Sequence, residues 1–169
     1  MEHLQTSKES FSKTIKNKLT VCFIVFIIIM VSPKLHTDES AHEGGFQELL
    51  VIAGALEYLG TPYVYAGVSK AGMDCSGFVY TAFKPVFEQA PRVSKDWNTL
   101  GIPVTNDFRP ADILLFANQG QIFHVAIYIG DNYFIHSASQ GPKTGVIISS
   151  LDEPYWKQYF YSARRLWYE

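Results

Sequence analysis

The stretch Met73-Asp-Cys-Ser-Gly-Phe-Val-Tyr80 holds Cys75, which is the one cysteine of the chain outside an apolar N-terminal segment. Asp74 and the small residues around the cysteine are typical of a helix N-terminus, and no helix breaker follows before Pro85. We therefore predict that Cys75 lies in the first turn of a helix. Unpaired backbone N–H groups and the helix dipole would favour its thiolate there. The alternative is a buried cysteine that packs as a small hydrophobic residue.

Upstream of this stretch, Gly60-Thr-Pro-Tyr63 ends a segment in which apolar residues recur at helical spacing. These residues are Phe46, Leu49, Leu50, Ala53, Leu56 and Leu59. We expect a helix over residues 46–59. Downstream, we expect residues 91–100 to form a loop that contains a short helix capped by Ser94.

After Asn106 the apolar period becomes that of strands, with turn residues between them. The expected strands are residues 112–117, 121–129, 132–136, 145–149 and 159–166. Helices that precede an antiparallel meander indicate an α+β domain, with its helices on one face of the sheet.

His124 lies within the expected strand 121–129, where alternation divides the side chains between two faces. His124 falls on the face of Ile122, Ala126 and Tyr128, and we expect it to point toward the helix of Cys75. His136 follows twelve residues later. A three-residue loop places the two histidines directly opposite or diagonally, depending on register, whereas a two-residue loop would put them on opposite faces.

The Asp-Cys-Ser-Gly and Gly-Thr-Pro-Tyr motifs, followed by two histidines, resemble the NlpC-type bacterial cell-wall cysteine endopeptidases. The resemblance runs from about Leu49 to the C-terminus. It implies a papain-like α+β fold, with N-terminal helices packed on a central antiparallel β-sheet. The implied activity is hydrolysis of peptidoglycan stem peptides, at the bond between D-γ-glutamate and diaminopimelate, without a metal or cofactor.

By this resemblance, Cys75 would be the nucleophile, His124 the base and acid, and His136 the orienting residue. Tyr63 would hold the oxyanion together with the backbone N–H of Cys75, or it is simply a packed aromatic residue.

Asp74 and Ser76 would belong to the substrate-binding set, Asp74 receiving the free amino group of a trimmed stem peptide. The alternative is that Asp74 only caps the helix. The chain departs from the family pattern at three positions where the family has glycine: Ala66, Ala111 and Ala126.

The 169 residues form one domain and an N-terminal leader in our interpretation. Lysines and then the uncharged apolar run of residues 19–31 predict a signal peptide or signal anchor over residues 1–32. Residues 33–45 read as a linker and residues 46–169 as the peptidase domain. Export to the cell envelope, the periplasm or the medium would follow, with N-terminal membrane association if the leader is not cleaved.

A net charge of −2 and scattered basic residues disfavour nucleic-acid binding. With Cys22 in the leader, Cys75 has no disulfide partner in the domain. Two rival functions stay open. One is an acyltransferase or amidase that uses the same thiol on a lipid or another amide, and the other is a catalytically idle, membrane-tethered wall-binding protein.

Overall fold

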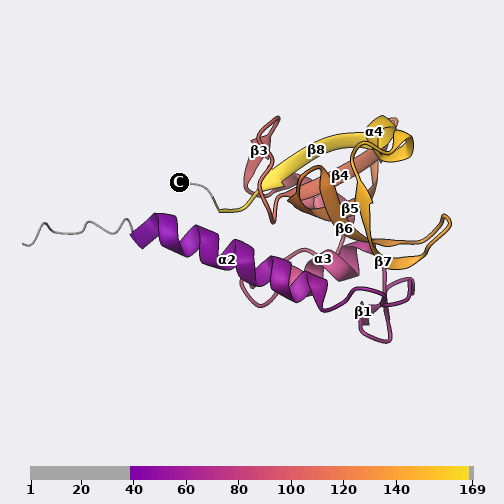
Figure 1. Cartoon of the computed structure of the whole chain (residues 1–169), viewed down its shortest axis with the longest axis horizontal. Helices are drawn as coiled ribbons and strands as arrows, with labels where there is room; N and C mark the ends of the chain where they lie inside the picture. Colours follow the sequence, from indigo (N-terminus) through magenta and orange to yellow (C-terminus); the bar gives the residue numbers. More distant parts are fainter. Residues whose placement is uncertain (1–38, 168–169) are drawn as a thin grey trace, which may run out of the picture. The chain divides into compact units, whose positions relative to one another are not determined.

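The computed structural model describes residues 39–167 of the chain (Figure 1). The predicted leader and the first residues of the predicted linker lie outside this part. In the described part, no helix is both long enough and apolar enough to cross a membrane.

The element order matches the predicted succession of helices and then strands (Figure 1). The elements are α2 (Glu39–Leu56), β1 (Val68–Ser69), β2 (Gly72–Met73), α3 (Cys75–Phe83), the 3₁₀ helix η1 (Ser94–Thr99), β3 (Ile102–Val104), β4 (Ile113–Asn118), β5 (Gln121–Gly130), β6 (Tyr133–Ala138), β7 (Gly145–Ser150), α4 (Pro154–Tyr159) and β8 (Phe160–Arg165). The five predicted strands correspond to β4 through β8. The α+β class is therefore confirmed.

The main sheet has the strand order β3-β8-β4-β5-β6-β7, and all its pairs are antiparallel. Strands β4 to β7 form the predicted meander. The prediction is wrong for β8, which follows α4 and pairs with β4, so that Ile113 lies opposite Arg164. Two short strands, β1 and β2, form a separate hairpin just before Cys75.

Two apolar clusters lie on the two faces of the sheet. On one face, Val51 of α2 and Phe78 of α3 belong to the same cluster as Ile127. On the other, Trp156 of α4 packs against a cluster that contains Phe116. Helices therefore cover both faces, and the prediction that they all lie on one face is wrong for α4.

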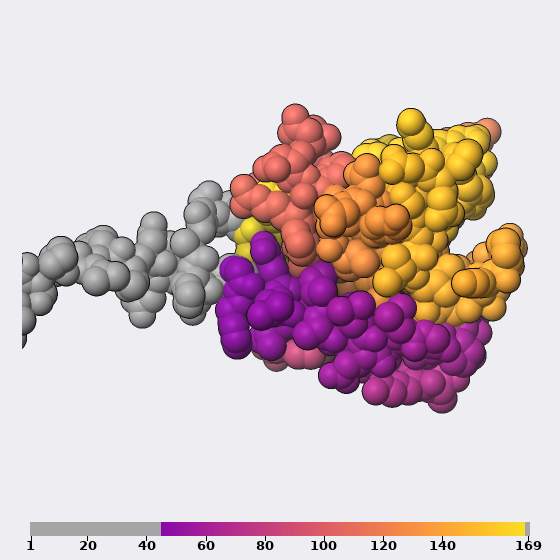
Figure 2. All heavy atoms as spheres, in the orientation of Figure 1, coloured from indigo at the N-terminus to yellow at the C-terminus, as the bar shows by residue number. Residues whose placement is uncertain are grey.

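Helix α2 begins at Glu39, so it includes the second half of the segment that we expected to be a linker. It buries Val51 and Ala55 against the domain, because their small side chains allow a close approach. Phe46 and Leu49 are 59% and 63% exposed. In the space-filling view, α2 lies at the surface, below the strands (Figure 2).

Candidate active site

Cys75 is the first residue of α3, as predicted, and Asp74 is the N-cap of that helix. Oδ1 of Asp74 accepts a hydrogen bond of 2.6 Å from the backbone N–H of Gly77. This bond satisfies one of the free donors at the helix start. A side chain at position 77 would collide with the carbonyl oxygen of Gly67, which explains the glycine after Cys75-Ser76.

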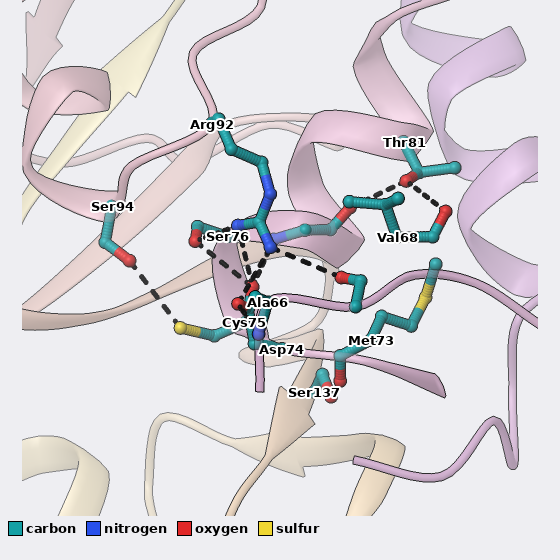
Figure 3. A network of polar contacts seen from close by, with 12 residues as sticks. Ala66, Val68, Met73, Asp74, Cys75, Ser76, Thr81, Arg92, Ser94 and Ser137 are labelled. Carbon is teal, nitrogen blue, oxygen red and sulfur yellow. Dashed lines mark hydrogen bonds and ion pairs between the residues drawn. The ribbon is translucent and has the colours of Figure 1, made fainter. Parts of the chain in front are cut away.

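Arg92 holds the capping carboxylate from the opposite side (Figure 3). Its Nη1 and Nη2 donate to Oδ1 and Oδ2 of Asp74 at 2.9 and 2.8 Å, a bidentate pair. Nη1 also donates to Oγ of Ser76 at 2.8 Å. The backbone N–H of Ala66 donates to Oδ2 of Asp74 as well. One carboxylate thus joins the β1–β2 region, α3 and the loop before η1.

Burial acts to raise the pKa of Asp74, but the hydrogen bonds from Arg92, Gly77 and Ala66 outweigh it and lower the pKa. The carboxylate stays ionised, and its lone pairs are already accepting bonds. The predicted capping role is therefore confirmed. A substrate amine could reach Asp74 only by sharing these oxygens.

The thiol of Cys75 lies against Ser94, the first residue of η1, and its Sγ is 3.6 Å from Oγ of Ser94 (Figure 3). Ser94 does not cap the short helix as expected, because Val93 occupies the N-cap and makes no side-chain cap bond. Its hydroxyl is instead available to the sulfur.

Burial raises the pKa of the Cys75 thiol, and the charge of Asp74 raises it further. The Ser94 hydroxyl and the backbone N–H groups of Val125 and Ser76 act to lower it, but they do not compensate. This direction disfavours the resting thiolate that the sequence predicted. The thiol is half-buried, and the loss of water around it outweighs the backbone N–H groups at the start of α3.

The turn between β5 and β6 sets the register of the two histidines. Its two residues, Asp131 and Asn132, both have positive φ. A bulge between Tyr128 and Gly130 shifts the pairing, with Ile127 opposite Ile135. The loop is thus the two-residue type that would have separated the histidines, yet the bulge returns them to one face as diagonal neighbours.

The two imidazole rings are hydrogen-bonded and buried. Nε2 of His124 lies 2.9 Å from Nδ1 of His136, and Nε2 of His136 lies 3.1 Å from Oγ of Ser149. His124 is 7% exposed and His136 is fully buried. The structure therefore brings together the pair that the sequence predicted, and it adds Ser149, which no sequence pattern singled out.

Burial lowers the pKa of His124 to about 3. Burial and the charge of His124 hold the pKa of His136 well below its usual value. Both rings are neutral at pH 7, beside a neutral thiol. Nδ1 of His124 has no hydrogen-bond partner among the described residues and is not among their buried unpaired atoms, so it is open to accept a proton.

Cys75 lies against β5 at Val125, the residue that follows His124 in the chain. Helix α3 packs on the face of Val125, whereas the ring of His124 lies on the face of Phe116, so the expectation that His124 faces α3 is wrong. The sulfur approaches β5 at Val125, whose backbone N–H acts on the thiol. Within the described residues, no hydrogen bond joins Sγ to either histidine. Catalytic hydrogen bonds are often long in a free enzyme.

Three aromatic residues enclose the histidine pair. The Trp156 ring lies 5.1 Å from the His124 ring and 4.8 Å from the His136 ring, centroid to centroid. Phe116 packs beside His124, and Phe134 beside His136. No sequence pattern indicated Trp156, because the six residues of α4 are too few for a periodic signal.

Tyr63 lies near the thiol, in a bridge between its backbone and Met73. Burial raises the pKa of its phenol, and the neighbouring Cys75, once ionised at high pH, and Asp74 raise it further. The phenol therefore keeps its proton at neutral pH and can donate a hydrogen bond close to Cys75. Its role as an oxyanion donor stays a prediction.

Two of the three departures from the family pattern lie at strained backbone positions. Ala66 and Ala111 have φ values of 60° and 69°, the left-handed region that favours glycine. Ala126 is not among the positive-φ residues and is fully buried in β5. The described residues contain no cluster of three or more histidine, cysteine or acidic side chains suited to a metal ion.

Comparison with known proteins identifies the family of this chain. The NlpC/P60 family model matches residues 60–165. The probable endopeptidase NlpC of Escherichia coli K12 is 40% identical, over 83% of this chain and 99% of its own length. The murein DD-endopeptidase MepS/murein LD-carboxypeptidase of E. coli K12 is 39% identical, over 65% of this chain and 58% of its own. The γ-D-glutamyl-L-lysine dipeptidyl-peptidase of Bacillus subtilis is 35% identical, over 76% and 44%.

Solved structures agree on the fold. A crystal structure of an NlpC/P60 family protein from Bacillus cereus superposes with a TM-score of 0.63 at 33% identity, and covers 72% of this chain and 40% of that protein. The family match extends over more than half of the chain and includes Cys75, His124 and His136. The chain therefore belongs to the NlpC/P60 family.

Proposed function

We propose that this protein is a cell-wall cysteine endopeptidase in which Cys75 is the nucleophile, His124 the general base and acid, and His136 the residue that orients His124. The observation that carries the proposal is the position of Cys75 at the start of α3, against β5, the strand that bears His124, whose ring is hydrogen-bonded to His136 of β6. A thiol, an imidazole and a group that orients the imidazole are the components of cysteine nucleophile catalysis.

The reaction starts from a neutral pair, because burial raises the pKa of Cys75 and lowers that of His124. As Sγ forms a bond to the scissile carbonyl carbon, the thiol proton passes to Nδ1 of His124. When the C–N bond breaks, His124 returns this proton to the leaving amine. Water then attacks the acyl-enzyme, again with His124 as base, and the thiol is restored.

The developing oxyanion needs donors in a site where little water competes. The backbone N–H of Cys75 and the phenol of Tyr63 supply them in our proposal, and the raised pKa of Tyr63 keeps the phenol a donor. Behind the nucleophile, Arg92 is hydrogen-bonded to Asp74 and Ser76, the residues on either side of Cys75 in the chain. This network holds the start of α3, and with it Cys75, in place.

The substrate that we propose is a peptidoglycan stem peptide, cut between D-γ-glutamate and diaminopimelate. One relative is named for a γ-D-glutamyl-L-lysine bond and another for a DD-peptide bond, so the two names indicate different scissile bonds. We favour the first bond because the family resemblance assigns Asp74 to the free amino group of a trimmed stem, and Asp74 stays ionised. The amine would share the carboxylate oxygens with Arg92 and two backbone N–H groups.

We also propose that the domain acts in the cell envelope, since one relative is named for murein. Residues 1–32 would deliver it as a signal peptide or a signal anchor. Fractionation of cells that express the native chain tests this. A full-length cytosolic pool with no membrane or envelope pool would reject it.

Mass spectrometry of muropeptides before and after digestion tests the proposed activity. We expect new products that end in D-γ-glutamate, with free diaminopimelate amines. Products cut at a DD bond would correct the bond and keep the enzyme class. Turnover of an acylated lipid or another amide, without any muropeptide product, would favour the acyltransferase or amidase alternative. No turnover of either would favour an idle wall-binding protein.

A further inference from the structure

Ser149 of β7 lies at the end of the hydrogen-bonded chain that begins at His124. Its side chain is 8% exposed, and its Oγ lies 3.1 Å from Nε2 of His136. Among the described residues, this is the only hydrogen bond of the Ser149 side chain. A catalytic contribution from Ser149 rests on the proposed function, in which Cys75, His124 and His136 carry the reaction.

Two proton arrangements satisfy the bond between the neutral rings. In the first, Nε2–H of His124 donates to Nδ1 of His136, and Nε2–H of His136 donates to Ser149. In the second, every donor is reversed: Ser149 donates to His136, which donates to Nε2 of His124. A hydroxyl can donate or accept, so Ser149 is compatible with both.

Only the first arrangement leaves a lone pair on Nδ1 of His124 that can take the proton of Cys75. It is also the only one compatible with the imidazolium that forms during the reaction, because that ring donates from both nitrogens. His136 must then accept at Nδ1 and carry its own proton at Nε2, which faces Ser149.

We propose that Ser149 is a positioning residue, the terminal acceptor that lets His136 act as the third member of the catalytic set. The pair of His136 and Ser149 does together what a single carboxylate does in other triads, without its negative charge. Without a hydroxyl at 149, a buried N–H of His136 would have no partner whenever His124 is charged. In the second arrangement the same loss leaves only a nitrogen lone pair without a donor, which costs less than a buried N–H without an acceptor. The second arrangement would then predominate, and Nδ1 of His124 would be blocked.

Ser149→Thr and Ser149→Val form a matched pair, since the two side chains have nearly the same shape and only threonine keeps a hydroxyl. Any cost of fitting a branched side chain is common to both. Ser162→Ala is a control for loss of a partly buried hydroxyl, because Ser162 bonds to Asn98 and not to the histidines. All variants are made in the full-length chain and assayed in detergent with a defined stem peptide.

We expect Ser149→Thr to keep kcat within about threefold of wild type, and Ser149→Val to lower kcat by about ten- to a hundredfold with little change in KM. Histidine ¹⁵N chemical shifts report the tautomer directly. Wild type and Ser149→Thr should show Nδ1 of His124 without a proton, whereas Ser149→Val should show it protonated. A role in packing alone would not change the tautomer.

Equal kcat and equal ¹⁵N shifts in the threonine and valine variants would overturn the inference. Equal losses of kcat in both variants, with the wild-type tautomer, would also overturn it by assigning Ser149 a packing role. If wild type itself cleaves no stem peptide, the proposed function fails, and the ¹⁵N comparison still decides the role of Ser149.

Discussion

Nε2 of His124 lies 2.9 Å from Nδ1 of His136, and within the described residues neither ring is hydrogen-bonded to a carboxylate. The orienting group of this site is therefore neutral. It can direct the catalytic imidazole, but it stabilises the imidazolium less than an aspartate would.

His136→Asn should keep measurable turnover, because the amide oxygen can accept the hydrogen bond from His124. His136→Ala should lose at least about tenfold more in kcat, since the Nε2–H of His124 is then left without its acceptor. Steady-state kinetics on a stem peptide measures the difference. Wild-type activity in His136→Ala would remove His136 from the site.

Alkylation of Cys75 by iodoacetamide should be slower in the native chain than in the unfolded chain at pH 7 to 8. The reason is that burial raises the pKa of the thiol, so less thiolate is present. Ser94→Ala should slow the reaction further, and Ser162→Ala should not change it. Peptide mapping separates Cys75 from Cys22. Faster alkylation in the native chain would show that the thiol is activated at rest.

Acid should destabilise the fold before the carboxylates titrate. In the unfolded chain the histidines titrate near pH 6.5, whereas burial lowers the pKa of His124 to about 3 and that of His136 in the same direction. Between these values the unfolded chain binds more protons. The free energy of unfolding therefore contains the full contribution of the two neutral histidines above about pH 6.5. It falls as the pH drops below that value, by up to about 1.4 kcal/mol per pH unit for each histidine.

Urea unfolding between pH 7 and 4.5 measures this loss, above the range in which Asp74 contributes, since its pKa is lowered from 3.8. His136→Gln should reduce the slope by the share of one histidine. A free energy of unfolding that is constant over this range would contradict the burial of neutral rings.

Ala66→Gly should raise the melting temperature, whereas Ala126→Gly should lower it. Ala66 is exposed and has a φ of 60°, a conformation that costs an L-residue about 1–2 kcal/mol and glycine very little. Ala126 lies in a strand with its methyl group fully buried, so glycine there loses packing and gains backbone entropy on unfolding. Thermal melting of both variants measures the direction of each change relative to wild type. A change of melting temperature in the same direction for both variants would contradict this explanation.

The sequence predicted features that have local signals. Asp74 and the small residues after it marked the start of α3, and alternation marked the strands that carry His124 and His136. Features that depend on distant contacts or on irregular backbone had no such signal. A two-residue turn alone would place His124 and His136 on opposite faces of the sheet, and the bulge near Ile129 places them on the same face. No sequence pattern predicts this bulge.

Sequence patterns also did not predict which residues contact the site or how deeply the site is buried. Arg92 meets Asp74 across 18 residues of chain, and Ser149 meets His136 across 13. The protonation states depend on burial from several elements at once, and this burial raises the pKa of Cys75, against the thiolate that the local pattern predicted. A sequence pattern identifies residues on one element but not the depth at which other elements cover them.

The central claim is that Cys75 is the nucleophile, and cleavage by Cys75→Ala tests it most directly. Muropeptide products of wild type and of the variant are quantified by mass spectrometry, with thermal melting of both as the control for folding. We predict no cleavage by a variant that melts close to wild type, because alanine is small and well tolerated in the first turn of α3. Stem-peptide cleavage by folded Cys75→Ala at a rate near that of wild type would contradict the claim.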